Sequence, residues 1–422
     1  MSEWKEYTLG ELTTDGKGTY GIAASAVDYC AELPTYLRIT DINDDGTIDF
    51  NGLKSVDDPN SSKYVLQEND IVFARTGAST GRSYFYDRRD GKFVYAGFLI
   101  KFSLDPKKVN PRILKYYTHS KVYYNWVHSF ENGATRGNIN AKTFADMKLL
   151  LPPRNVQDSI ASILSSFDDK IAINRRICEN LEAQAQALFK HWFIDVAPFK
   201  NGKFVESELG MIPEGWRVGR YSDIIQETIS GDWGKENAEG NYTHKVACIR
   251  GCDFQDVKMG LRGKTPERFI LEKNYQAKHF EDKDVLVEIS GGTATVSTGR
   301  VCPVSQLLID KYNGDIVCTN FCRLVRPCKG FSSYLYYSWK YKYDHKVMFG
   351  YENGTSGIKN FSIKDFSTRE PLVLPDLSAL KDFERIIEHI HAQIQNYGSE
   401  SSRLSALRDT LLPKLMSGEI KV

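Results

Sequence analysis

The sequence contains no apolar run that approaches the roughly 20 residues of a membrane-spanning helix. Its mean hydropathy is −0.40, and residues 1–12 lack the basic start and apolar core of a secretory signal. We therefore expect a soluble protein of the cytoplasm. At 422 residues, the chain is long enough for two or three domains that each bury a core.

Cysteine is sparse and scattered, which argues against a disulfide framework. The chain has eight cysteines, all of which we expect to be reduced because nothing in the sequence indicates secretion. A C-x3-C spacing occurs twice, at Cys248 with Cys252 and at Cys318 with Cys322, and His244 lies near the first pair. No C-x2-C knuckle accompanies these pairs, so packing within strands is favoured over a zinc site, which stays the alternative. We expect no metal in this chain.

An excess of positive charge is also missing. The formal net charge is only +1, which argues against a protein that holds a polyanion over its whole surface. Any contact with nucleic acid must therefore use local basic groups.

Catalytic motifs are absent as well. The only Pro-Pro pair, Pro152-Pro153, begins a helical segment and is not part of the Asn/Asp-Pro-Pro-aromatic motif of an adenine methyltransferase. The Gly-Lys-Thr of residues 263–265 imitates the end of a P-loop, but Lys258 stands where the first glycine is required. Serine, histidine and aspartate occur without a nucleophile elbow. We expect no enzyme activity from this chain alone; an undetected active site is the alternative.

What the sequence does contain is an internal duplication. The Leu-Leu-Pro of residues 150–152 recurs as Val-Leu-Pro at 373–375, 223 residues later. The Ser-Thr-Gly-Arg of residues 79–82 recurs unchanged at 297–300, 218 residues later. The matches follow one another in the same order along both halves, and their offset drifts in one direction. This pattern is typical of a tandem repeat with small insertions in the second copy.

A long helical segment with heptad periodicity follows each Leu-Pro. The first has the rows Ile160, Phe167, Asn174, Leu181, Leu188 and Leu164, Ile171, Cys178, Ala185, Trp192. The second has the rows Phe383, Ile390, Tyr397, Leu404, Leu411 and Ile387, Ile394, Ser401, Arg408, Leu415. Because an offset of 223 maps one set onto the other, we predict a coiled-coil seam in which the polar residues fix register. Two unrelated amphipathic helices on separate cores are the alternative.

The remaining segments indicate mixed α and β structure. Residues 70–74 and 284–288 have the composition of strands, and Gly-Thr-Ser clusters follow them as loops. Residues 113–127 and 334–347 are aromatic helix candidates, and a connector rich in proline and glycine joins the two copies. We predict an α+β chain with mixed α/β domains at 1–154 and 196–376 (the latter including the connector), and long coiled-coil helices at 155–195 and 377–422.

This architecture resembles the specificity subunit of type I restriction-modification systems over essentially the whole chain. The resemblance rests on the repeat, on the connector from the His-Trp-Phe-Ile-Asp of residues 191–195 to the Gly-Met-Ile-Pro-Glu-Gly-Trp of 210–216, and on the tail at 411–420. It implies two target recognition domains that each read half of a split DNA site, and two helices that pair antiparallel and dock modification subunits. It also implies that S-adenosylmethionine, ATP and Mg belong to the partner modification (adenine methyltransferase) and restriction subunits.

The expected geometry agrees with that resemblance. The second domain is inserted between the helices, so antiparallel pairing would hold the two domains apart on a rod of about 50 to 60 Å. One turn of DNA is about 34 to 36 Å, so we expect a bipartite target with a spacer, asymmetric because the two domains differ. A protein scaffold with two related modules is the competing interpretation.

The repeated Ser-Thr-Gly-Arg loop is the first candidate for DNA contact. Small residues allow close backbone approach, hydroxyl groups bind phosphate, and arginine binds phosphate or guanine. The residues are Arg75, Thr76, Ser79 and Arg82 in the first copy and Thr293, Ser297 and Arg300 in the second. The alternative is that the glycines only close a tight turn and the arginines are solvated. A motif shared by two domains suits phosphate positioning better than base reading.

The loop after each Glu-Asn-Gly is the second candidate. It contributes Arg136, Asn138 and Asn140 in the first copy and Lys359 and Asn360 in the second. Asparagine can pair with adenine, but it is also an ordinary turn residue, and that interpretation is favoured. The aromatic run at 334–343 could stack on bases, although packing of a helix is favoured.

Overall fold

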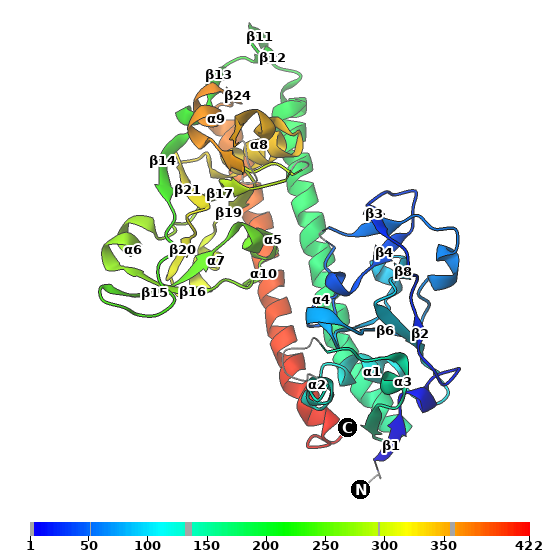
Figure 1. Ribbon diagram of the computed structural model, residues 1–422. Helices are drawn as coiled ribbons and strands as arrows, with labels where there is room; N and C mark the ends of the chain where they lie inside the picture. Colours follow the sequence, from blue (N-terminus) through cyan, green and yellow to red (C-terminus); the bar gives the residue numbers. More distant parts are fainter. Residues whose placement is uncertain (1–3, 51, 131–136, 294–295, 355–358) are drawn as a thin grey trace. The chain divides into compact units, whose positions relative to one another are not determined.

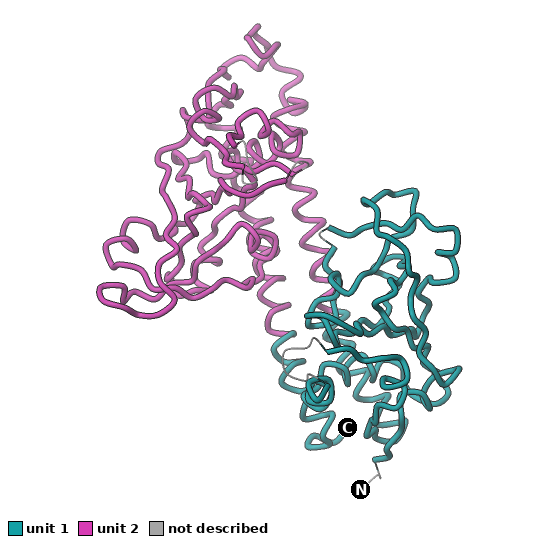
Figure 2. The backbone as a smooth tube through the Cα atoms, in the orientation of Figure 1, with its two compact units in different colours: residues 1–169, 405–422 teal, residues 170–404 magenta. Residues whose placement is uncertain are grey.

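The computed structural model describes residues 4–50, 52–130, 137–293, 296–354 and 359–422. The chain divides into two compact units, which Figure 2 colours separately. Unit 1 comprises residues 1–169 and 405–422, and unit 2 comprises residues 170–404. Both units are mixed α and β, as predicted. No helix among the described residues combines the length and apolarity that crossing a bilayer requires.

Unit 1 contains two four-stranded sheets and a two-stranded ribbon. The first sheet has the order β2 (Thr19–Tyr20), β9 (Leu99–Ser103), β6 (Asp70–Ala74), β7 (Ser83–Phe85). The second has the order β3 (Ala26–Asp28), β5 (Lys54–Val56), β4 (Thr35–Leu37), β8 (Phe93–Tyr95). The ribbon pairs β1 (Lys5–Thr8) with β10 (Lys148–Leu151). In the part of the chain that the structure describes, three helices lie between β9 and β10 (Figure 1): α1 (Pro111–Tyr117), α2 (Lys121–His128) and α3 (Ala141–Ala145).

Unit 2 repeats this plan. A sheet of order β14 (Ile225–Ser230), β21 (Cys322–Pro327), β17 (Val285–Glu288), β19 (Val301–Pro303) corresponds to the first sheet of unit 1. A sheet of order β16 (Glu267–Leu271), β15 (Tyr242–Ile249), β20 (Ile316–Cys318) corresponds to the second, with one strand fewer. The pair β13 (Arg217–Arg220) and β24 (Pro371–Leu374) corresponds to the ribbon. In each unit, the only parallel pairing in these sheets is at one edge of the second sheet. It joins β4 to β8 in unit 1 and β15 to β20 in unit 2.

The other elements of unit 2 are short, apart from one aromatic helix. They are α5 (Phe254–Lys258), α6 (Glu272–Lys278), α7 (Gln306–Asp310), α8 (Ser332–Asp344) and α9 (Ile363–Arg369). The strands β18 (Ser290–Gly291), β23 (Lys359–Phe361) and β22 (Glu352–Asn353) form a small sheet. The connector contains a hairpin of β11 (Phe204–Ser207) and β12 (Gly210–Pro213) that the composition did not predict.

The central strands are buried on both faces, which explains their continuous apolar runs. Ile71 and Phe73 of β6 face the core that also contains α1 to α3, whereas Val72 faces the second core of unit 1. In β17, Val285 and Val287 face one core and Leu286 faces another. The strands expected at 70–74 and 284–288 are therefore confirmed, and they lie at the centre of their units.

Two long helices contribute to both units. They are α4 (Arg154–Phe189, 36 residues), which continues as a π-helical turn over Lys190–Ile194, and α10 (Leu377–Met416, 40 residues). Within unit 1, Ile160 and Leu164 share a core with Leu412 and Leu415.

Within unit 2, the pairing of α4 with α10 continues in the same sense. Cys178 Sγ lies 3.7 Å from the Ile394 carbonyl, and Ala185 and Phe189 share a core with Phe383. Residues with higher numbers in α4 contact residues with lower numbers in α10, so the helices pair antiparallel in each unit.

None of the heptad residues is exposed, since each is buried or half-buried, and the polar members Asn174 and Ser401 contact each other. Asn174 has no exposed surface, and its Nδ2 donates to Glu400 Oε2 at 2.8 Å and to Ser401 Oγ at 3.3 Å. Its Oδ1 has no hydrogen-bond partner in the described part of the chain. Burial of an unpaired amide oxygen costs stability, which is consistent with a role in fixing register.

One expected helix is two. The aromatic segment at 113–127 is interrupted between α1 and α2, because Ser120 accepts a hydrogen bond from the Tyr123 amide at 3.2 Å and begins a second helix. In the second copy, α8 is continuous, and Tyr334, Tyr336, Tyr337 and Trp339 are buried. The interpretation that this run packs a helix is confirmed.

The cysteines near residue 248 pack as expected, with one exception. Cys248, Cys318 and Cys322 are buried in β15, β20 and β21, whereas Cys252 is exposed. Burial raises the pKa of the Cys248 thiol to about 12. His244 is held by carboxylates, with Nδ1 2.7 Å from Glu272 and Nε2 2.9 Å from Asp315.

Candidate nucleic-acid interface

The Ser-Thr-Gly-Arg segment forms the same tight turn in both units. Gly81 and Gly299 have φ of 86° and 91°, which favours glycine. The Gly81 carbonyl accepts a hydrogen bond from Tyr123 Oη at 2.6 Å, and the Gly299 carbonyl accepts one from Trp339 Nε1 at 3.0 Å. An aromatic side chain from a following helix therefore anchors each turn.

Both arginines of the turn are bound to acids of their own unit. Arg82 Nε lies 2.6 Å from Asp44 Oδ1. Arg300 makes two bonds to Glu288, at 2.7 and 2.6 Å, and these bonds raise the pKa of Arg300. This geometry supports turn closure, the alternative interpretation, although the arginines are paired and not simply solvated. Their contact with DNA stays a prediction.

The serines and threonines of this candidate divide between buried and exposed positions. Ser79 and Ser297 are buried, so their hydroxyl groups are not available at the surface. Thr76 is half-buried and forms an isolated bridge with Asn138. Thr293 is exposed, and its Oγ1 accepts a hydrogen bond from the Val296 amide at 3.0 Å.

Arg75 has an environment unlike that of the turn arginines. Its guanidinium lies 5.1 Å from the ring centroid of Tyr20, and its Nε is buried without a hydrogen-bond partner in the described part of the chain. Its amide donates to the Phe98 carbonyl at 3.1 Å. Within the described ranges, Arg75 forms no ion pair with a carboxylate.

The second candidate loop is only partly described. Arg136 lies outside the described residues. Asn138 is exposed, but Asn140 caps α3, because its Oδ1 accepts from the Thr143 amide at 2.9 Å. Lys359 Nζ lies 3.0 Å from Glu352, and Asn360 bonds to Ser290 through its Oδ1. Asn140 fits the turn-residue interpretation, and Asn138 keeps a free surface.

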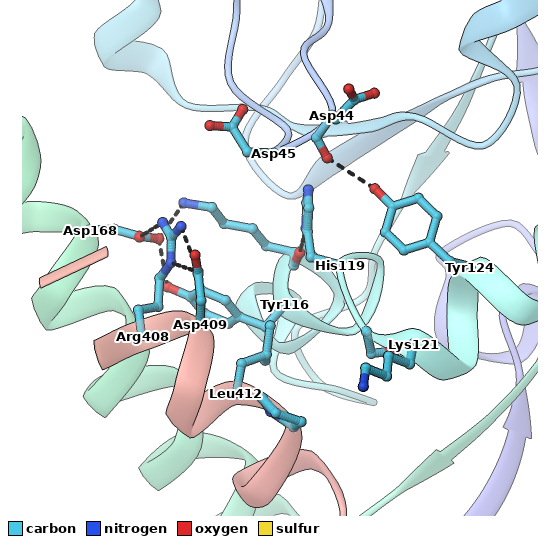
Figure 3. A pocket seen from close by; sticks show the side chains of 13 residues that line it. Asp44, Asp45, Tyr116, His119, Lys121, Tyr124, Asp168, Arg408, Asp409 and Leu412 are labelled. Carbon is cyan, nitrogen blue, oxygen red and sulfur yellow. Dashed lines mark hydrogen bonds and ion pairs between the residues drawn. The ribbon is translucent and has the colours of Figure 1, made fainter. Parts of the chain in front are cut away.

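A cavity of about 300 Å³ in unit 1 does not fit an anion (Figure 3). Asp168 of α4 lies on its wall and receives Lys115 Nζ at 2.6 Å, Tyr116 Oη at 2.9 Å and Arg408 at 2.8 Å. Burial opposes ionisation of Asp168, but Lys115 and Arg408 together hold its pKa below the usual value. Asp44, Asp45 and Asp409 also line the cavity, so carboxylates outnumber cations there and phosphate binding is disfavoured.

Sequence reasoning missed a repeated arginine clamp. Arg38 binds Asp41 through Nε at 3.0 Å and Nη2 at 2.6 Å, and Arg250 binds Asp253 through the same atoms at 2.9 and 3.0 Å. Each arginine follows the parallel strand of its unit, β4 or β15. The signal was present, since Arg-x-x-Asp follows an apolar strand in both copies.

Sequence reasoning also missed two exposed phenylalanines at equivalent positions. Phe98 is 58% exposed and precedes β9, and Phe321 is 61% exposed and precedes β21. They are 223 residues apart, the offset of the Leu-Pro repeat. Self-comparison of the sequence could have found the pair, but only the structure shows that both rings are at the surface.

No group of three or more histidine, cysteine, aspartate or glutamate side chains among the described residues has the arrangement of a metal site.

Comparison with known proteins matches residues 1–183 to the family model described as the type I restriction modification DNA specificity domain. The HindI specificity subunit of Haemophilus influenzae is 22% identical, with full coverage of both chains. The MjaIX specificity subunit of Methanocaldococcus jannaschii is 25% identical over 73% of this chain and 69% of its own length. A solved type I restriction-modification S subunit from M. genitalium is 16% identical and covers 98% of this chain and 96% of its own, with a TM-score of 0.48.

Proposed function

Since this chain is a relative of the specificity subunits of type I restriction-modification systems, we propose that it recognises DNA sequence for such a complex. Each unit would read one half of a bipartite, asymmetric target in double-stranded DNA. The chain itself would carry no catalytic group. S-adenosylmethionine, ATP and Mg would be bound by partner subunits, in the cytoplasm.

The observation that carries the proposal is that one strand topology recurs in both units, while the residues around the shared turn differ between them. Both units place corresponding strands and the same glycine turn in the same order. The partner of the turn arginine differs, since Arg82 pairs with Asp44 on a loop and Arg300 pairs with Glu288 at the end of β17. Repeated frames with different loops suit two different half-sites, because loops on a rigid scaffold commonly carry recognition.

The long helices supply a spacing device in this proposal. At about 1.5 Å per residue, α4 and α10 are about 54 and 60 Å long. A rod of this length would separate two readers by more than one turn of DNA, about 34 to 36 Å. The exposed faces of the pair would dock the modification subunits, two of them if the repeat is used symmetrically, and restriction subunits would join through these.

The test is methylation mapping by long-read sequencing in a host that expresses this chain with its neighbouring methyltransferase. One asymmetric motif, with two specific parts separated by an untouched spacer, is expected to carry N6-methyladenine. A host with the methyltransferase alone is the control and should lack the motif. An intact, expressed pair that leaves adenine methylation unchanged would contradict the proposal and favour a protein scaffold.

A further inference from the structure

A loop at the end of the parallel strand pair presents an exposed phenylalanine in each unit, and its backbone is fixed in the same way. The Arg75 amide donates to the Phe98 carbonyl at 3.1 Å, and the Ile289 amide donates to the Phe321 carbonyl at 2.8 Å. A Cβ on Gly231 would lie 2.0 Å from the Thr319 carbonyl oxygen, and one on Gly21 would lie 2.2 Å from that of Ala96. Such close approach requires glycine, so the same backbone contact is present beside both loops, and both phenylalanine rings are largely exposed.

In unit 2 the phenylalanine stands beside a cavity of about 350 Å³. Phe321 and Trp233 line it, and the guanidinium of Arg268 lies 3.9 Å from the centroid of the Trp233 ring. That volume is at the lower end of the range of small-ligand pockets. The cavity therefore has room for one planar group between or beside aromatic surfaces.

The charged groups on the cavity wall are already neutralised. Arg250 is bound by both oxygens of Asp253, and Glu288 is bound by Arg300. A phosphate would find no free cation among these groups, and a cation would find no free carboxylate. The cavity is suited to a neutral group with an apolar edge.

One neutral polar side chain at the cavity is available for pairing. Asn320 lines the cavity, and its side-chain amide makes no hydrogen bond within the ranges the structure describes. Its backbone carbonyl, by contrast, accepts a hydrogen bond from the side chain of Arg323. An asparagine amide pairs with N6 and N7 of adenine in the major groove, and an apolar side chain contacts the methyl group of thymine. Asn320 and Phe321 are adjacent in the chain, and the adenine N6/N7 edge and the thymine methyl lie on the same major-groove edge of one base pair.

We propose that Asn320 and Phe321 read one A·T base pair in the half-site of unit 2, the amide on adenine and the ring on the thymine methyl. This inference rests on the proposed function. In unit 1, Gly97 and Phe98 occupy the equivalent positions. Unit 1 therefore keeps the methyl contact and lacks the amide contact, which makes this loop one place where the two half-sites come to differ.

The experiment uses the complex of this chain with its modification subunit and duplexes that carry the mapped motif. Each thymine is replaced in turn by deoxyuridine, which lacks only the methyl group, and affinity is measured at fixed salt. We expect one replacement to weaken wild-type binding about 4-fold, the effect of one buried methyl. The same replacement should have no further effect in Phe321→Ala, and Phe98→Ala should lose its response at a thymine of the other half-site.

The amide is tested at the same base pair. Replacing that A·T pair by G·C should weaken wild-type binding about 10-fold or more, and Asn320→Ala should reduce this discrimination to the roughly 4-fold that the methyl contact of Phe321 supplies. Leu307→Ala, which truncates another exposed apolar side chain of unit 2, is the control and should bind as wild type. Because Phe321 is exposed, its truncation should leave the unfolding midpoint unchanged.

Failure of this loop assignment can be distinguished from failure of the proposed function. If the wild-type complex binds its motif specifically but no thymine couples to Phe321, or if Asn320→Ala retains full discrimination, the assignment of this loop is wrong. If the wild-type complex shows no sequence preference, the proposed function fails instead.

Discussion

The two units build the same turn but give its arginine different partners. In unit 1, Arg82 pairs with Asp44, whose side chain is 77% exposed and lies on a loop. In unit 2, Arg300 pairs with Glu288, whose side chain is 8% exposed and ends strand β17. The four shared residues therefore specify a backbone shape, while the electrostatic role of the arginine is set by residues that differ between the copies.

The segments of the helix pair differ in the same way. In unit 1, α4 and α10 meet through a buried carboxylate, Asp168, and Arg408. In unit 2 they meet through the amide of Asn174, which bonds to Glu400 and to Ser401. The helix pair thus contains a buried carboxylate in unit 1 and a buried amide in unit 2, and the two should respond differently to substitution.

The largest expected effect is from Asp168→Asn in unit 1. This change leaves Lys115 and Arg408 without their shared carboxylate, and removing one partner of a buried charge cluster costs about 3 kcal/mol. Urea unfolding monitored by hydrogen exchange in β6 and β9 would measure the loss. Asp169→Asn, which removes an exposed partner of Arg89, is the control and should cost under about 1 kcal/mol.

The same carboxylate gives unit 1 an acid dependence. Because the pKa of Asp168 is lowered in the folded state, its stabilisation is present above the unfolded value of about 3.9 and is lost as pH falls through the folded pKa. Asp168→Asn should lack this component. Equal acid sensitivity in wild type and variant would show that the cluster does not stabilise the ionised form.

The second prediction compares the two turn arginines. Arg300→Ala leaves Glu288 buried without its partner, so we expect a loss of about 2 kcal/mol, reduced from the fully buried case because Arg300 is partly exposed. Arg82→Ala should cost under about 1 kcal/mol, because Asp44 is solvated. Hydrogen exchange in β17 and in β6 would report the two units separately. Similar losses at both sites would contradict the distinction.

The third prediction concerns the buried amide of the seam in unit 2. Asn174→Leu removes a buried amide whose Oδ1 has no partner in the described structure, so we expect a gain of about 1 kcal/mol. The unfolding midpoint in urea measures it. Asn180→Leu, at an exposed position of the same helix, should leave the midpoint unchanged. A loss of stability on Asn174→Leu would mean that its hydrogen bonds outweigh the buried amide.

The smallest expected effect is from His244 in unit 2. Burial opposes its protonation, but Glu272 and Asp315 outweigh burial and raise its pKa. Its stabilisation is therefore present below the unfolded value of about 6.5 and lost as pH rises through the folded pKa. His244→Gln should cost a few tenths of a kcal/mol at pH 6, and this cost should disappear as pH rises through the folded pKa of His244. His389→Gln, at an exposed position of α10, is the matched control substitution.

Sequence alone predicted the elements that local patterns encode. Heptad spacing identified both long helices and their shared register, and apolar runs located β6 and β17. It also pointed to the family that residues 1–183 match. It did not predict the connector hairpin. It also did not predict the break between α1 and α2, because a single capping residue, Ser120, outweighs the helical propensity on either side of it.

The candidate contact residues were less predictable. The sequence identified the repeated turn, but Asn140 is a helix cap and Ser79 is buried. Phe321 was missed because an isolated phenylalanine is more often a core residue than an exposed one. Whether a polar or aromatic side chain points outward depends on strands that pair across many residues.

The sequence by itself thus determined the duplication and the shared heptad register of the two long helices, because both depend on periodicity, whereas antiparallel pairing was expected only from the family resemblance. Tertiary structure alone decided that Glu288 would neutralise Arg300 while Asp44 neutralises Arg82, and that Asn320 and Phe321 would border a cavity without free charge. The physical reason is that these environments arise from contacts between segments far apart in the chain, and short-range patterns carry no record of them.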